Sequence, residues 1–123
     1  MTQSEFLKER TKRFAISVIR LFRLLPKTEE ARVVGRQVLR SSTSVAANYR
    51  AVCRARSKAE FVAKMGIVVE EADETVFWLE LLVDAQVARQ EQVANVLTEA
   101  NELLAIFAAS QRTVKSANDS INK

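Results

Sequence analysis

Histidine is absent from this chain of 123 residues. Without it the chain lacks the commonest metal ligand and the usual general base, and it can form neither a Ser-His-Asp nor a Cys-His catalytic arrangement. The single cysteine, Cys53, cannot close an intrachain disulfide or build a cysteine-rich zinc site, which is typical of a reducing compartment. These absences exclude most hydrolases and predict a non-enzymatic protein with no metal and no cofactor.

Turn-forming residues and long apolar runs are also scarce. The chain has Gly 2 and Pro 1, which is too few for a turn-rich β-sandwich or a disordered linker. No uncharged run approaches the roughly 20 residues that a membrane-spanning helix needs. The N-terminal residues MTQSEFLKERTKR carry charges where a secretory signal requires an apolar run. We therefore expect a helical, cytoplasmic protein that makes no contact with a membrane.

The fold follows from apolar residues that recur at three- and four-residue steps in four segments, the spacing of amphipathic helices. Pro26 ends the first segment, Thr28 offers an N-cap for the second, and Ser57 with Glu60 forms a capping box for the third. Short connections force neighbouring helices of this length to run antiparallel. The sequence therefore predicts an all-α fold, an antiparallel up-down-up-down four-helix bundle.

The predicted helix boundaries follow from the same proline and capping residues. The four helices are predicted at residues 5–25, 29–53 or 29–55, 57–86 and 90–110. One domain, residues 1–112, contains them all, because a chain of this length builds a single core. Residues 113–123 are polar and lack periodicity, so we expect a frayed C-terminal tail.

Positive charge is concentrated in the first half of the chain. Residues 1–56 carry 13 Lys/Arg and 4 Asp/Glu, whereas residues 57–123 carry 6 and 11. The planar arginine side chain can donate two hydrogen bonds to one phosphate, so these arginines predict a surface for a nucleic-acid backbone. No base-reading motif accompanies them. The candidate residues are Arg13, Arg20, Arg32, Arg36, Arg40, Arg50 and Arg54. The alternative is that the basic half neutralises the acidic half within one fold.

Polar residues interrupt the apolar stripe of the second helix at Ser41 and Asn48. A buried polar group costs a few kcal/mol unless it is hydrogen-bonded, so partners are expected on the acidic third helix. The predicted network, which would fix the register of two antiparallel helices, consists of Gln37, Ser41, Ser44, Asn48, Glu71 and Glu74. The alternative is a small polar pocket that binds a ligand.

The third helix is apolar over more of its circumference than the roughly 100° that one bundle core requires. A line of valines recurs every seven residues beside its core stripe. Exposed apolar patches usually mark protein interfaces, so we expect a homo-oligomer. The candidate interface residues are Val62, Val69, Val76, Val83 and Phe77. The alternative is an enclosed central helix in a monomer.

Several local features of residues 21–82 form a distinctive set: the Leu25-Pro26 break, Gln37 followed by Arg40-Ser41-Ser42 and Ser44, Ala47-Asn48-Tyr49, the stretch Arg54-Ala55-Arg56-Ser57, Glu60-Phe61, and the 71–82 segment with Trp78. In these the chain resembles the bacterial four-helix-bundle family of 23S rRNA intervening-sequence proteins. The resemblance implies a ring-like homopentamer, and a related bundle is the accessory protein of diversity-generating retroelements, where a basic pentamer partners reverse transcriptase and nucleic acid. Ala51 stands where the family usually has an acid, so one expected ion pair is missing.

Together these features predict a non-enzymatic oligomer, a pentamer by the resemblance, that offers an arginine-rich surface to RNA or DNA as a scaffold or chaperone. The alternative is a protein-protein interaction scaffold that recruits another polypeptide and binds no nucleic acid. A third hypothesis, an enzyme that uses the carboxylates of the third helix, requires a metal. Carboxylate bundles of that kind use Glu-x-x-His pairs, which this sequence cannot supply.

Overall fold

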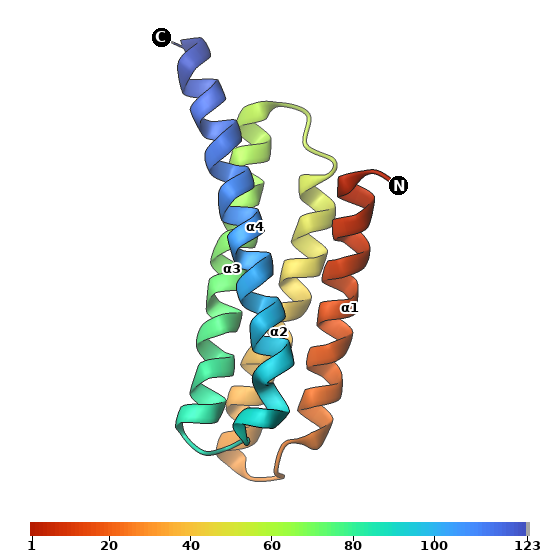
Figure 1. The fold of residues 1–123 in the computed structure, drawn as a ribbon, viewed down its shortest axis with the longest axis vertical. Helices are drawn as coiled ribbons and strands as arrows, with labels where there is room; N and C mark the ends of the chain where they lie inside the picture. Colours follow the sequence, from red (N-terminus) through yellow and green to blue (C-terminus); the bar gives the residue numbers. More distant parts are fainter. Residues whose placement is uncertain (123) are drawn as a thin grey trace.

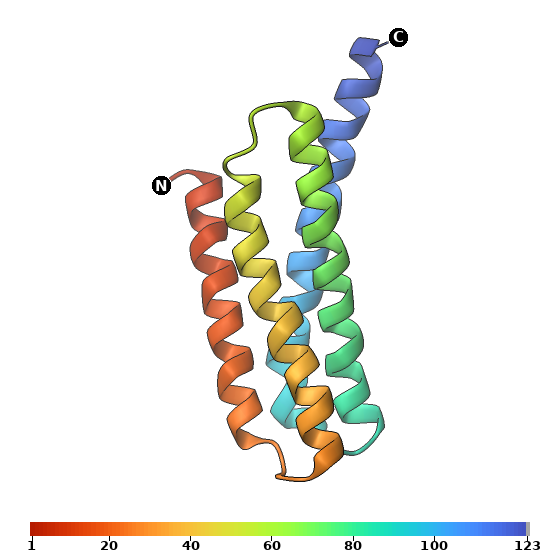
Figure 2. The same cartoon turned by 180° about the vertical axis from the view of Figure 1, so that it is seen from behind.

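A computed structural model describes the backbone of residues 1–122 and the side chains of residues 1–117. It contains four helices, α1 (Gln3–Leu24), α2 (Glu29–Val52), α3 (Lys58–Asp84) and α4 (Gln90–Asn122), each antiparallel to the one before (Figure 1). α1 and α3 both pack against α2 and α4, so they lie diagonally, at opposite edges of the bundle in Figures 1 and 2. The prediction of an all-α, up-down-up-down four-helix bundle is confirmed.

Local hydrogen bonds determine where the helices begin. Thr2 and Glu5 form a capping box, in which each side chain accepts a hydrogen bond from the backbone N–H of the other residue, at 3.1 and 3.0 Å. Thr28 caps α2, and the Ser57 hydroxyl accepts from the Glu60 N–H at 3.0 Å. The Glu60 carboxylate pairs with Lys64 at 2.8 Å, which lowers the pKa of Glu60. The Thr28 and Ser57 N-caps predicted from the sequence therefore start α2 and α3, whereas among the described residues the Glu60 side chain does not complete the predicted capping box with the Ser57 N–H.

The fourth helix is longer than predicted. The sequence predicts its end near residue 110, whereas α4 continues to Asn122. Residues 111–122 contain no glycine or proline to break it, and the Thr113 hydroxyl donates to the Ala109 carbonyl at 2.9 Å. The side chains of residues 118–123 lie outside the described residues. The division into a bundle and a frayed tail stays a prediction.

The core runs the length of the bundle. Gly35 lets α1 approach α2 closely, because a Cβ atom there would lie 2.8 Å from Cδ2 of Phe22. The Tyr49 and Phe107 rings pack at 5.3 Å between centroids, and burial raises the pKa of the Tyr49 phenol. Among residues 1–122 no helix is long and apolar enough to cross a membrane. The apolar side chains that are fully buried in the described part of the chain are Val18, Val45, Val68, Leu79, Leu82, Val93 and Phe107.

The valine line of α3 does not form the exposed ridge that the sequence predicts. Val76 is buried, and the other three valines, Val62, Val69 and Val83, are half-buried. Val69 and Val83 pack against the core, and Gln111 of α4 donates to the Val62 carbonyl at 3.2 Å. α4 covers this side of α3 and so shields the valines in part, and an oligomer contact at these residues stays a prediction. Of the predicted interface residues only Phe77 is exposed, at 54%.

The turn after α3 holds a non-glycine residue in the left-handed region. Gln86 has a φ of 60°. The Val87 N–H donates to the Leu82 carbonyl at 2.9 Å and the Gln86 N–H to the Val83 carbonyl at 3.0 Å, which is the hydrogen-bond pattern of a Schellman motif. Glycine is preferred at this position because it has no Cβ atom.

We therefore expect Gln86→Gly to raise the free energy of unfolding by about 0.5–1 kcal/mol. Urea unfolding followed by circular dichroism measures this change. Gln86→Ala is the matched control, because it keeps the Cβ atom and so should give no comparable gain. Equal stabilities for the glycine and alanine variants would contradict the prediction.

Candidate functional site

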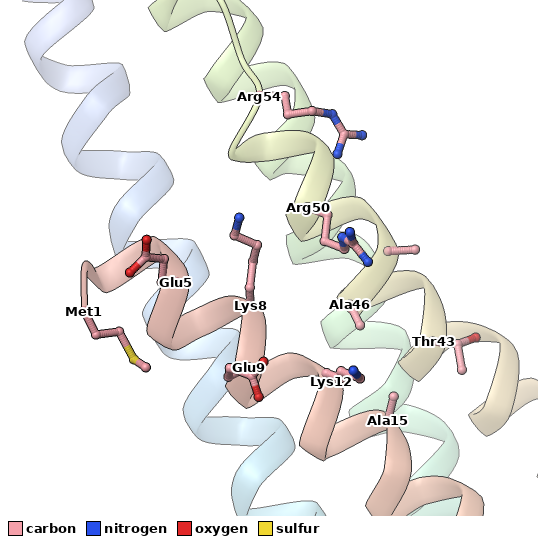
Figure 3. Close-up of a pocket in the computed structure, with 11 residues that line it drawn as sticks. Met1, Glu5, Lys8, Glu9, Lys12, Ala15, Thr43, Ala46, Arg50 and Arg54 are labelled. Atoms are coloured by element: carbon pink, nitrogen blue, oxygen red, sulfur yellow. The ribbon is translucent and has the colours of Figure 1, made fainter.

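An open groove with a volume of about 910 Å³ lies between the start of α1 and the end of α2 (Figure 3). Small side chains, Ala15 of α1 with Thr43, Ala46 and Ala47 of α2, leave room between the two helices. This floor offers no aromatic ring on which a base could stack. The groove can therefore accept a chain or a group that is recognised through its charge.

Four cationic side chains line this groove, Lys8 and Lys12 from α1 and Arg50 and Arg54 from α2 (Figure 3). All four are exposed, and within the described part of the chain none forms an ion pair. Two carboxylates also line the groove: Glu5 accepts the capping hydrogen bond, and one exposed acid, Glu9, remains. The groove thus carries a net positive charge that no described carboxylate neutralises by direct contact.

The position of the two lysines follows from the helix repeat. Lys8, Lys12, Ala15 and Phe22 follow the three- and four-residue spacing of one helix face, and Phe22 packs against Gly35 of α2. The lysines therefore lie on the side of α1 that faces α2. The candidate set named from the sequence contains arginines alone, although the spacing of the two lysines was a usable signal.

The structure brings only two of the seven predicted arginines to the groove. The seven fall into four groups: Arg50 and Arg54 in the groove, Arg32 and Arg36 exposed on the first half of α2, Arg13 and Arg20 exposed on α1, and Arg40 against α3. Only the first group joins the lysines at the groove. Cations at the site come from both helices, and so the site depends on how α1 and α2 pack.

Arg40 joins α2 to α3. Its Nε–H donates to Oε1 of Gln37 at 3.0 Å and its Nη1 donates to Oε2 of Glu71 at 3.3 Å, while its Nη2 forms an ion pair with Glu74. Three residues of the predicted polar network are therefore brought together. The residue that joins them is an arginine that the sequence analysis assigned to the nucleic-acid surface.

A second polar contact lies in the core between the same helices. The hydroxyl groups of Ser41 and Thr75 are 2.8 Å apart and both residues are fully buried; Oγ1 of Thr75 is also 2.7 Å from the Glu71 carbonyl oxygen. Asn48 bonds within its own helix, donating to the Ser44 carbonyl at 2.9 Å. The six predicted residues therefore divide into separate contacts. Thr75, the missed partner, could have been found as a polar residue on the core stripe of α3.

Arg10 is another cation with a structural partner. It lies 2.7 Å from Glu99 and 2.8 Å from Glu102, and so ties α1 to α4. The hydrogen bond between Arg10 and Glu99 lowers the pKa of Glu99 and raises that of Arg10. Among the described residues, no cluster of acidic or cysteine side chains is arranged to hold a metal ion. The groove is thus the place where cations remain unpaired around an open space.

The chain matches a known protein family and solved structures. A family model described as 23S rRNA-intervening sequence protein matches residues 6–109. The chain is also similar to a crystal structure from Bacteroides thetaiotaomicron VPI-5482, a protein of unknown function from the S23 ribosomal protein family. That similarity has 30% sequence identity and a TM-score of 0.81, over 90% of this chain and 99% of the other. A comparison with curated proteins found no match. The matched range contains all four cations of the groove.

Proposed function

Because the chain belongs to the 23S rRNA-intervening sequence protein family, we propose that it is a non-enzymatic, oligomeric bundle that binds the phosphate backbone of RNA or DNA. The binding site is the groove between α1 and α2, and the role is that of a scaffold or chaperone in the cytoplasm. The observation that carries the proposal is the set of four unpaired cations around the groove. A pentamer is the assembly that the family resemblance supports.

The chemistry of the groove favours a backbone over bases. Each arginine can donate two hydrogen bonds to one phosphate, and each lysine supplies a point charge. Lys8 and Lys12 are one helical turn apart, as are Arg50 and Arg54, so the four charges can contact successive phosphates of one strand. The floor provides no base stacking, and its one side-chain hydroxyl, that of Thr43, donates to the Leu39 carbonyl. We therefore expect binding that is strongly dependent on salt and nearly independent of sequence.

The test measures binding to a labelled single-stranded RNA of mixed sequence by fluorescence anisotropy over a range of salt concentrations. Each phosphate contact contributes about −0.7 to the slope of log K against log salt for a single strand, so four contacts predict a slope of about −3. The variant Lys8→Ala/Arg50→Ala removes one cation from each side of the groove. It should reduce the size of the slope by about 1.4 and weaken binding most at low salt.

Lys27→Ala/Arg89→Ala is the matched control. It removes the same charge from two exposed loop positions at the opposite end of the bundle, so it should leave the slope nearly unchanged. A duplex DNA probe tested in parallel distinguishes the two nucleic acids. If neither RNA nor DNA binds at low salt, the proposal is overturned, and recruitment of another protein becomes the better hypothesis.

A further inference from the structure

α3 presents an acidic stripe to the outside, with an aromatic ring at its middle. Its residues recur at alternating three- and four-residue steps on one helix face: Glu70, Asp73, Phe77, Glu80 and Asp84. All five are exposed, and within the described residues none of the four acids forms an ion pair. The Phe77 ring packs edge-on against Trp78, so it is supported in an exposed position. A ring held outward among free carboxylates is a candidate contact surface.

α1 carries a stripe with the same pattern and the opposite charge. Arg13, Ile16, Arg20 and Arg23 recur at steps of three, four and three residues. All four are exposed, Ile16 at 38%, and none is in an ion pair with a described residue. Between residues 13 and 23 of α1 and between residues 70 and 84 of α3, each stripe therefore consists of one apolar residue flanked by charges of one sign, and the exposed Glu9 precedes the α1 stripe.

The centres of the two stripes lie at nearly the same height along the bundle. Phe22 of α1 packs against Gly35 of α2, so antiparallel packing places Ile16 at the height of Ser41. The Ser41 hydroxyl in turn is hydrogen-bonded to the hydroxyl of Thr75 in α3. Thr75 precedes Phe77, the aromatic centre of the acidic stripe, by two residues. The two apolar centres thus differ in height by about 3 Å, the rise of two helical residues.

The two stripes also point in opposite directions. α1 and α3 are the diagonal pair of the bundle and run parallel to each other (Figures 1 and 2). A rotation about an axis parallel to the bundle can therefore bring α1 of one copy alongside α3 of the next. Such a contact is heterologous, and it closes into a ring when the rotation between successive copies closes and the copies do not climb along the axis. The near-equal heights of the stripes satisfy the second of these conditions.

We infer that a second copy of this chain is the partner of each stripe: the α1 stripe of one subunit docks on the α3 stripe of the next, head to tail. Phe77 packs beside Ile16 in this contact, Arg13 lies near Asp73, and Arg20 lies near Glu80. The inference rests on the oligomer of the proposed function and names the surfaces that build it. The groove cations lie on the side of α1 that faces α2, so the contact leaves them open.

Charge reversal tests the contact, with mass measured by light scattering in the absence of nucleic acid. The wild type should be an oligomer. Arg13→Glu/Arg20→Glu and Asp73→Arg/Glu80→Arg should each be monomeric while keeping wild-type helicity by circular dichroism. An equimolar mixture of the two variants should regain the oligomer, because each supplies the complement that the other lacks. Arg112→Glu/Lys115→Glu, an equal reversal on exposed residues of α4, should keep the wild-type mass.

The outcomes separate the contact from the assembly and from nucleic-acid binding. A monomeric wild type at high micromolar concentration overturns both the oligomer and the contact. An oligomeric wild type whose mass survives either reversal overturns the contact alone. Two monomeric variants that do not assemble when mixed also overturn it. This mixing experiment therefore separates loss of the specific contact from loss of the oligomer through damage to the fold. The groove variants test nucleic-acid binding separately.

Discussion

Phe107→Ala is expected to lower the free energy of unfolding by about 3–5 kcal/mol. The Phe107 side chain is fully buried and its ring packs against that of Tyr49. Truncation removes buried apolar area and leaves a cavity, since helices that pack on all sides collapse only partly around a lost ring. Because a domain of this size is stable by about 5–15 kcal/mol, the loss is a large share of the total.

Urea unfolding at fixed protein concentration measures this loss. Phe6→Ala is the matched control, because Phe6 is a phenylalanine of α1 that is 49% exposed and outside both charged stripes. Its truncation should cost less than about 1 kcal/mol. Similar losses for the two variants would show that the Phe107 site is not the tightly packed core described above. The fixed concentration matters because an oligomer gains apparent stability from association.

The helix starts could be predicted because their causes are local. Pro26 restricts the residue before it, and the Thr28 and Ser57 hydroxyls cap helices within three residues of themselves. The end of α4 could not be predicted in this way. Loss of apolar periodicity at residues 111–117 indicates that few side chains are buried there, and Gln111 and Val114 are only half-buried, but this loss does not break the backbone hydrogen bonds of a helix.

Contacts between helices were less predictable, because they depend on register and on the angle between neighbours. The sequence indicated that Ser41 needs a polar partner, but the identity of that partner, Thr75, depends on the axial register between α2 and α3. Likewise, the breadth of the apolar arc on α3 was predicted, but the share of it that α4 covers was not. Val76 is consequently buried within the chain, whereas Phe77, the next residue, is exposed.

Three environments contain most of the cations in the basic half of the chain. Arg10 and Arg40 pair with acids of α4 and α3 inside one subunit, as the neutralisation hypothesis requires. The α1 stripe has its match in the free acids of α3, which a second copy can supply. Lys8 and Arg50, in the groove, have no described acid partner in either set. The neutralisation hypothesis therefore holds for Arg10 and Arg40, whereas a nucleic-acid surface stays a proposal for the groove residues.

Thr75→Val is expected to lower the free energy of unfolding by about 1–3 kcal/mol, the cost of leaving a buried hydroxyl without its partner. Valine has nearly the shape of threonine, so no cavity forms. Ser41 keeps only a 3.4 Å contact with the Val38 carbonyl. Thr43→Val is the matched control. Its hydroxyl also bonds a carbonyl four residues earlier, at 2.7 Å, but Thr43 is exposed and water can replace the bond, so the change should stay within about 0.5 kcal/mol.

The double variant Ser41→Ala/Thr75→Val decides whether the loss comes from the hydrogen bond. If it does, removing both hydroxyls leaves no unpaired group, and the double variant should lose less stability than the sum of the two single variants. Urea unfolding of the four proteins gives this coupling energy. Losses that add within about 0.5 kcal/mol would mean that the contact between the hydroxyls does not stabilise the pairing of α2 with α3. The register of these helices would then depend on apolar packing and on the Arg40 ion pairs.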